Sequence, residues 1–148
     1  MRAAEVMTAH PESCHPGDDV EVALSVMDAN ECGVVPIVDD DGRIVGIVTD
    51  RDILFGARRN GGSLAGLNIE TCMTKDPVTA RPDDSLEEIV QRMARAGIRR
   101  IPIVDDRGKL EGIVAQADLA IHIDDDVLVA EYLRKVSAAP ADEPAVER

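Results

Sequence analysis

The residues best suited to chemistry stand in the stretch Gly46–Asp52, where a threonine and an aspartate are three positions apart. The apolar run 44–48 predicts a short buried strand. Thr49 suits the N-cap of a following helix, and Asp52 is placed to reach back to that cap. The first N–H groups of such a helix lack partners within the helix, so the turn can bind an anion. A hydroxyl and a carboxylate at this spacing can hold a phosphate and a ribose together; the alternative is a capping box without a ligand.

The elements that must position this turn occur twice, because the sequence matches itself at an offset of 66 residues without a gap. Residues 5–53 and 71–119 share 17 identities in 49 positions, which is far more than the composition alone would supply. The matching blocks are Met7-Thr8 with Met73-Thr74, Pro36–Asp39 with Pro102–Asp105, Gly46–Val48 with Gly112–Val114, and Asp52 with Asp118.

Each copy predicts a short extended piece, an amphipathic helix, a β-hairpin and a second helix. Apolar residues recur at i, i+3, i+4 and i+7 from Val20 and again from Leu86, which predicts the first helix. Gly42 and Gly108 supply positive φ angles in the hairpin turns. The predicted ranges are 12–14 and 78–80 for the extended pieces, 34–38, 43–48, 100–104 and 109–114 for the hairpin strands, and 50–59 and 116–122 for the second helices.

The remaining segments predict a linker, a last helix and a tail. We assign repeat 1 to residues 3–58, a linker to 59–70 and repeat 2 to 71–122. The linker contains the flexible run Asn60–Ser63, followed by a loosely packed piece at 64–70. Three aspartates at 124–126 favour the start of a C-terminal helix over 123–136. Residues 137–148 are rich in Ala, Pro and Glu and predict a disordered tail.

The composition bounds the functional class. The chain has 148 residues, a formal net charge of −13, no Trp, one Tyr and one Phe. Nucleic-acid binding needs a basic face or stacking aromatic side chains, so this class is not expected. No apolar run approaches the roughly 20 residues of a membrane span. The N-terminus lacks a charged-then-apolar signal segment, so we expect a cytoplasmic protein.

The metal-binding and redox residue types lack the spacings of a site. Cys14, Cys32 and Cys72 form no CxxC motif, and His10, His15 and His122 are scattered. Free, mostly buried thiols are therefore expected, with a redox pair of Cys14 and Cys32 as the alternative. No nucleophile, base and orienting residue occur as a set, so we expect neither an enzyme nor a required cofactor or metal.

A tandem β-α-β-β-α unit that ends its hairpin in G-h-h-[ST]-x-x-D (h, apolar) resembles the CBS domain, and the pair resembles a Bateman module. The resemblance covers residues 3–122, and the chain is similar to the stand-alone bacterial CBS-pair proteins. It implies an α+β fold in which the two repeats pack with pseudo-twofold symmetry and form two clefts. It also implies adenosine-type ligands and a disc-like homodimer.

By this resemblance, one cleft combines the Thr49 turn with strand residues of the second repeat. Asp52 would accept hydrogen bonds from ribose hydroxyls, and Arg100 would bind phosphate. Val78 and Ile101 would enclose the adenine; a solvated strand end is the alternative for Arg99 and Arg100. The implied nucleotide-binding residues are Thr49, Asp50, Asp52, Pro77, Val78, Thr79, Arg99, Arg100, Ile101 and Pro102.

The other cleft is expected to be empty or weak. Ala115 takes the place of the hydroxyl, and Val34 takes the place of the arginine. Asp118 could still hold a ribose, and Glu12 would repel a phosphate. The implied residues of this weaker cleft are Val34, Val35 and Asp118, with Pro11, Glu12, Ser13, Cys32 and Gly33 nearby.

The expectation is therefore a regulatory CBS-pair module that binds an AMP-, ADP- or ATP-like nucleotide in one inter-repeat cleft. The alternative is a ligand-free dimeric interaction module. An unidentified protein target is the expected partner that reads the state of the module, and the sequence does not name it.

Overall fold

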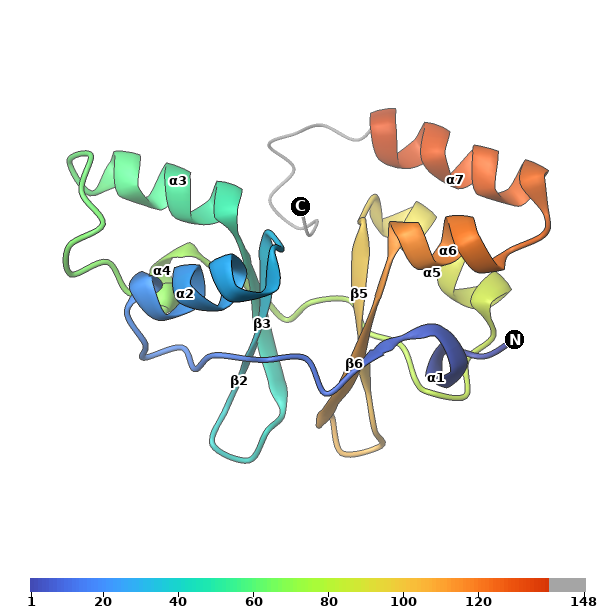
Figure 1. The fold of residues 1–148 in the computed structure, drawn as a ribbon, viewed down its shortest axis with the longest axis horizontal. Helices are drawn as coiled ribbons and strands as arrows, with labels where there is room; N and C mark the ends of the chain where they lie inside the picture. Colours follow the sequence, from blue (N-terminus) through green and yellow to red (C-terminus); the bar gives the residue numbers. More distant parts are fainter. Residues whose placement is uncertain (139–148) are drawn as a thin grey trace. The chain divides into compact units, whose positions relative to one another are not determined.

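The computed structural model describes residues 1–138, which form two compact units (Figure 1). The first-repeat unit comprises residues 12–76, and the second-repeat unit comprises residues 1–11 together with residues 77–138. Each unit contains one three-stranded antiparallel sheet and its own apolar core. The prediction of an α+β fold built from two similar halves is confirmed.

In the first-repeat unit the strand order is β2-β3-β4. Pro36 and Ile47 are paired across the hairpin, while Ile37 and Val48 turn toward the helices and join the core. The elements are α2 (Val20–Asn30), β2 (Val34–Val38), β3 (Ile44–Thr49), α3 (Asp50–Arg59), α4 (Ile69–Cys72) and β4 (Thr74–Lys75).

Among the described residues, the second-repeat unit has the order β1-β6-β5 and four helices, one more than the first. Its core gathers the predicted stripe of α5, the inward residues of β5 and β6, and Tyr132 and Val136 of α7. The elements are α1 (Ala3–Val6), β1 (Thr8–Ala9), α5 (Leu86–Ala96), β5 (Arg100–Val104), β6 (Leu110–Ala115), α6 (Gln116–His122) and α7 (Asp126–Ala138).

The third strand of each sheet comes from the other copy of the repeat. β4 opens the second copy but pairs with β3, and β1 opens the first copy but pairs with β6. Glycine makes this pairing possible, because a Cβ on Gly46 would lie 2.7 Å from Sδ of Met73. Gly112 meets Met7 in the same way. The repeated Met-Thr and Gly-Ile-Val motifs therefore encode one contact, a methionine packed over a glycine of the central strand.

The local predictions agree closely with the observed elements. The outer hairpin strands 34–38 and 100–104 and the helices 50–59 and 116–122 have the predicted bounds. The return strands begin and end one residue later than predicted, so Thr49 is both the last residue of β3 and the N-cap of α3. Gly42 and Gly108 take φ angles of 82° and 83° in the turns.

Two predictions need correction, and the predicted extended pieces are present but short. Residues 64–70 are not loosely packed, because Leu67 and Ile69 are buried and α4 begins at Ile69. The Leu67 carbonyl also accepts a hydrogen bond from the Val20 N–H at 2.9 Å. The extended pieces contribute only single parallel bridges, at Cys14 and Ala80. The last helix starts at 126 and continues to Ala138, so residues 137 and 138 of the predicted tail are helical. The rest of that tail, 139–148, lies outside the described residues.

Within residues 1–138, no helix has the length and apolar character needed to span a bilayer.

Candidate ligand site

The turn between β3 and α3 is a complete capping box. The Thr49 hydroxyl accepts from the Asp52 N–H at 3.1 Å, and the Asp52 carboxylate accepts from the Thr49 N–H at 2.9 Å. Thr49 is only 1% exposed, whereas Asp52 is half-buried. The Thr49 hydroxyl still has a proton to donate, and a carboxylate has about four acceptor positions. The cap therefore fixes both groups in position without using all of their hydrogen-bonding capacity.

A glycine makes room beside this turn. The Asp50 N–H donates to the Gly33 carbonyl at 2.9 Å, at the entrance to β2. A Cβ at Gly33 would lie 2.8 Å from the Asp50 carboxylate, so a larger residue would displace that side chain. Val34 pairs directly with Thr49, and Val35 pairs with Val48. These residues of the predicted weaker cleft therefore adjoin the hydroxyl turn on the same hairpin.

The equivalent turn of the second repeat keeps the aspartate and loses the hydroxyl. The Asp118 carboxylate accepts from the Ala115 N–H at 2.8 Å, and Ala115 offers no side-chain cap. Gln116 takes the place of Asp50, and its N–H donates to the Arg99 carbonyl at 2.9 Å. Among the described residues, the Gln116 Oε1 atom is buried without a hydrogen-bond partner. Sequence reasoning missed Gln116, although its position in the repeat could have marked it.

The cationic half of the predicted nucleotide site lies on β5. Arg99 is exposed and Arg100 is half-buried, and Arg100 pairs with Ala115 across the hairpin. Neither guanidinium forms an ion pair within the part of the chain that the structure describes. Ile101 and Pro102 follow on the same strand and are buried. Two guanidinium groups near one strand end favour an anion such as phosphate.

An arginine that sequence reasoning missed holds the segment predicted to contact adenine. Arg92 of α5 donates to the Thr79 carbonyl at 2.9 Å and to the Asp84 carboxylate at 3.2 Å. Ala80 bonds to β5 through both its N–H and its carbonyl, while Val78 is 36% exposed. The position equivalent to Arg92 in the first repeat is a valine, so the repeat comparison alone could have singled it out.

The predicted residues thus fall into two groups. Thr49, Asp50 and Asp52 lie together in the first-repeat unit, beside Val34 and Val35. The second-repeat unit contains the other group, which consists of Pro77, Val78, Thr79, Arg99, Arg100, Ile101, Pro102 and Asp118.

The cysteines are all free thiols in the structure. Cys14 and Cys72 are buried and Cys32 is exposed, so the expectation of burial holds for two of the three. Burial, with the nearby Asp18 and Glu12 carboxylates, raises the pKa of the Cys14 thiol from 9.0 to about 11. This thiol therefore stays protonated and unreactive at neutral pH. Within residues 1–138, no group of three or more His, Cys, Asp or Glu side chains is arranged to hold a metal ion.

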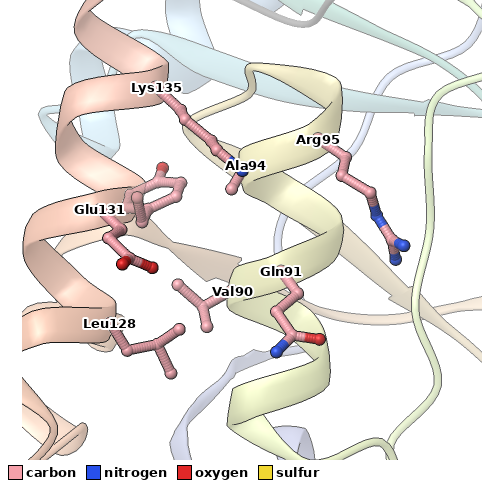
Figure 2. Close-up of a pocket in the computed structure, with 8 residues that line it drawn as sticks. Val90, Gln91, Ala94, Arg95, Leu128, Glu131 and Lys135 are labelled. Carbon is pink, nitrogen blue, oxygen red and sulfur yellow. The ribbon is translucent and has the colours of Figure 1, made fainter.

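A surface hollow of about 290 Å³ lies apart from these residues, between α5 and α7 (Figure 2). Val90 and Leu128 point into it from the two helices, and Glu131 lies beside them. Tyr132 closes its floor, where the phenol donates to the Ile98 carbonyl at 2.8 Å. The hollow contains none of the residues predicted to bind a nucleotide.

Comparison with models of known protein families shows to which family this chain belongs. The model of the CBS domain matches residues 3–58 and 68–125. The chain belongs to the CBS domain family. The resemblance inferred from the repeated Pro-Ile-Val-Asp and Gly-to-Asp motifs is therefore confirmed, and the chain is a tandem CBS pair.

Two relatives show the contexts in which such a CBS pair occurs. The uncharacterized protein YlbB of Bacillus subtilis is 39% identical over 122 residues, covering 79% of this chain and 78% of YlbB. The inosine-5'-monophosphate dehydrogenase of Nitrosopumilus maritimus is 34% identical over 123 residues, covering 83% of this chain. The match spans only 24% of that enzyme. CBS pairs thus occur both in chains of similar length and within larger enzymes.

Two similar solved structures contain adenosine compounds. The CBS domain pair of protein MJ0100, in complex with 5'-methylthioadenosine and S-adenosyl-L-methionine, has a TM-score of 0.73 and 26% identity. The match covers 82% of this chain and 94% of that structure. CBSX2 of Arabidopsis thaliana, in complex with AMP, has a TM-score of 0.70 and 24% identity, with 83% and 98% covered. Because CBSX2 is only 24% identical, its similarity supports the assignment of the fold and nothing further.

Proposed function

We propose that this CBS pair is a regulatory module, not an enzyme, that binds an adenine nucleotide between its repeats. In this proposal Thr49 and Asp52 bind the α-phosphate and ribose, and Arg100 binds phosphate from the second repeat. The main support is that the two units offer complementary groups for one ligand. The first-repeat unit has a preformed turn with a hydroxyl and a carboxylate, and the second has two arginines that form no ion pair among the described residues. The adenosine compounds bound by the MJ0100 pair support the ligand class.

The proposed inter-repeat cleft is supported by the outer faces of the hairpins. Val34 and Ile47 are buried, yet they belong to neither core cluster, and the same holds for Ile113. An apolar sheet face must be covered to be stable, so a strand pair that is apolar on both faces favours packing of sheet against sheet. Such packing would bring the Thr49 turn and Arg100 to a common cleft.

The second cleft would be weak in this proposal. It would contain Asp118 without a hydroxyl beside it, and Val34 in place of an arginine. The Gln116 Oε1 atom offers one unpartnered acceptor, which suits a neutral adenosyl group better than a phosphate. The three free thiols fit a reducing compartment such as the cytoplasm.

The alternative is a ligand-free interaction module, and the capping box itself favours it. The Thr49 and Asp52 side chains already bond each other's backbone N–H, so the turn needs no ligand to be stable. In that case the unidentified protein partner, and not a nucleotide, would set the state of the module.

A ligand panel distinguishes these functions. Co-purified adenine would absorb near 260 nm, where a chain with no Trp and one Tyr absorbs weakly. Melting temperatures are then measured with AMP, ADP, ATP and S-adenosylmethionine, since a ligand at about 100 times its Kd stabilises by roughly 2.7 kcal/mol. We expect Asp52→Ala to abolish the shift.

Asp118→Ala is a matched control, because Asp118 makes the same N-cap bond in the second repeat. It should lower stability by a similar amount and keep the ligand shift. If Asp118→Ala alone removes the shift, the two clefts are assigned in the wrong order. If no adenosine compound shifts the melting temperature, the interaction module is the better account.

A further inference from the structure

The side chains of Met7 and Met73 contact the central strand of each sheet through their sulfur atoms. Among the atoms near Gly46, Met73 Sδ is the closest to the position of a Cβ at that glycine, at 2.7 Å. Met7 Sδ is likewise the closest atom to a Cβ position at Gly112. Each contact lies within a single unit. Oxidants attack methionine at its sulfur, so the reactive atom is also the atom that contacts the glycine.

These two methionines are more accessible than the methionines of the long helices. Met7 and Met73 are half-buried and pack against the apolar cores without belonging to them. Met27 of α2 is 5% exposed and Met93 of α5 is fully buried, and both belong to the cores. An oxidant dissolved in water reaches a partly exposed sulfur before a buried one. The structure therefore predicts that Met7 and Met73 are oxidised before Met27 and Met93.

The strands that follow these methionines are very short. β1 and β4 have two residues each. One further bond continues each pairing: the His10 N–H donates to the Glu111 carbonyl at 3.0 Å, beyond β1. Beyond β4, the Asp76 N–H donates to the Val45 carbonyl at 3.2 Å. The chain then passes into the other unit, after Pro11 in one case and after Asp76 in the other. Because few backbone bonds hold these strands, the methionine contact is a substantial part of their attachment.

We propose that Met7 and Met73 are sites of oxidation by a peroxide, and that their oxidation releases β1 and β4 from the sheets. The peroxide transfers one oxygen atom to the thioether sulfur. Its O–O bond breaks, an S–O bond forms, the sulfur loses two electrons, and the peroxide leaves as water or an alcohol. The product sulfoxide is larger and polar, so it is disfavoured at an apolar contact. Reduction of the sulfoxide restores the thioether, which makes the release reversible. This proposal uses none of the proposed nucleotide contacts.

Treatment of the full chain with hydrogen peroxide tests this proposal, in a Cys32→Ala background that removes the exposed thiol. Dithiothreitol is then added, because it reverses the oxidation of thiols to disulfides or sulfenic acids and leaves sulfoxides unchanged. Peptide mass spectrometry should find sulfoxide at Met7 and Met73 before the helix methionines.

The release of the strands is measured by amide hydrogen exchange. Exchange at His10 and Asp76 should become at least about tenfold faster after oxidation, since these amides report the pairing of β1 and β4. The melting temperature should fall by about 4 °C or more. Methionine sulfoxide reductases should reverse both changes.

Two double variants identify the sulfur atoms responsible. Met7→Leu with Met73→Leu should abolish the response to peroxide, because leucine has a similar volume and no sulfur. Met27→Leu with Met93→Leu is the matched control, which removes two buried methionines and should leave the response unchanged.

The exchange measurement needs no methionine variant, so it decides the question even if a double variant is unstable. The proposal is overturned if Met7 and Met73 are oxidised no faster than the helix methionines, or if their sulfoxides form without faster exchange at His10 and Asp76. A Met7→Leu/Met73→Leu variant that responds to peroxide as its parent does would overturn it as well.

Discussion

At the turn after its hairpin, the first-repeat unit has Thr49 where the second-repeat unit has Ala115, although the strand pairing around the two residues is identical. In both turns an aspartate accepts a hydrogen bond from the N-cap N–H. The features that form the fold are therefore duplicated, and the hydroxyl that could bind a ligand is not. The shared carboxylate closes the N-cap in both repeats. The unmatched threonine and arginines are what set the proposed site at Asp52 apart from its counterpart at Asp118.

The largest difference between the units is α7, which only the second-repeat unit has. Tyr132→Ala removes a buried ring from its core and the bond to the Ile98 carbonyl, so unfolding should become easier by about 3–5 kcal/mol. The measurement is a urea titration at neutral pH. Leu133→Ala, at the adjacent and 37% exposed position, is the control and should cost far less. Equal losses for the two variants would mean that α7 contributes little to this core.

An intermediate effect is expected where the two turns differ. Thr49→Ala converts the first turn to the pattern of the second and should lower the free energy of unfolding by roughly 1 kcal/mol, since an N-cap acceptor is lost. The reciprocal variant, Ala115→Thr, should recover part of that amount in the second repeat. Thermal denaturation of both variants without ligand tests this. A Thr49→Ala variant as stable as the wild type would show that the hydroxyl is retained for binding alone.

The smallest effect concerns one buried position and appears only at alkaline pH. Cys14 of the first repeat matches Ala80 of the second, and both bridge to the hairpin of their own unit. The folded thiol has a raised pKa of about 11, so the unfolded chain ionises first as the pH rises. The stability contributed by the neutral thiol is complete below about pH 9 and declines as the pH approaches 11.

Cys14→Ala should flatten that decline in the free energy of unfolding between pH 8 and pH 11, measured by denaturant titration at each pH. Cys32→Ala, which removes an exposed thiol, should leave the slope unchanged. An identical pH dependence in the wild type and in Cys14→Ala would show that other groups dominate in this range.

The strands and helices could be predicted because the sequence patterns that determine them extend over only a few neighbouring residues. Alternating and helical apolar patterns gave the bounds of β2, β5, α3 and α6, and the Thr49 cap followed from two side chains three residues apart. The four-residue α4 was missed because one turn of helix shows no periodicity. The role of Arg92 was missed because it depends on the fold bringing α5 to the Thr79 carbonyl.

The candidate site was predictable only in halves. The residues themselves identified the Thr49 turn, and the family resemblance supplied the Arg100 strand and the shared cleft. Each set of residues lies within its own unit. The exchange of β1 and β4 could not be predicted, because a strand has the same apolar pattern whichever hairpin it joins. The meeting of the two halves remains a proposal for the same reason.

That exchange also bears on how the gene could have evolved. The segment that was duplicated and the segment that folds are not the same piece of polypeptide. A recombination breakpoint between residues 60 and 67 would separate the two copies of the repeat in the sequence. Each product would still lose the third strand of its sheet, because β4 pairs with β3 and β1 pairs with β6. Selection should therefore keep the two copies in one reading frame.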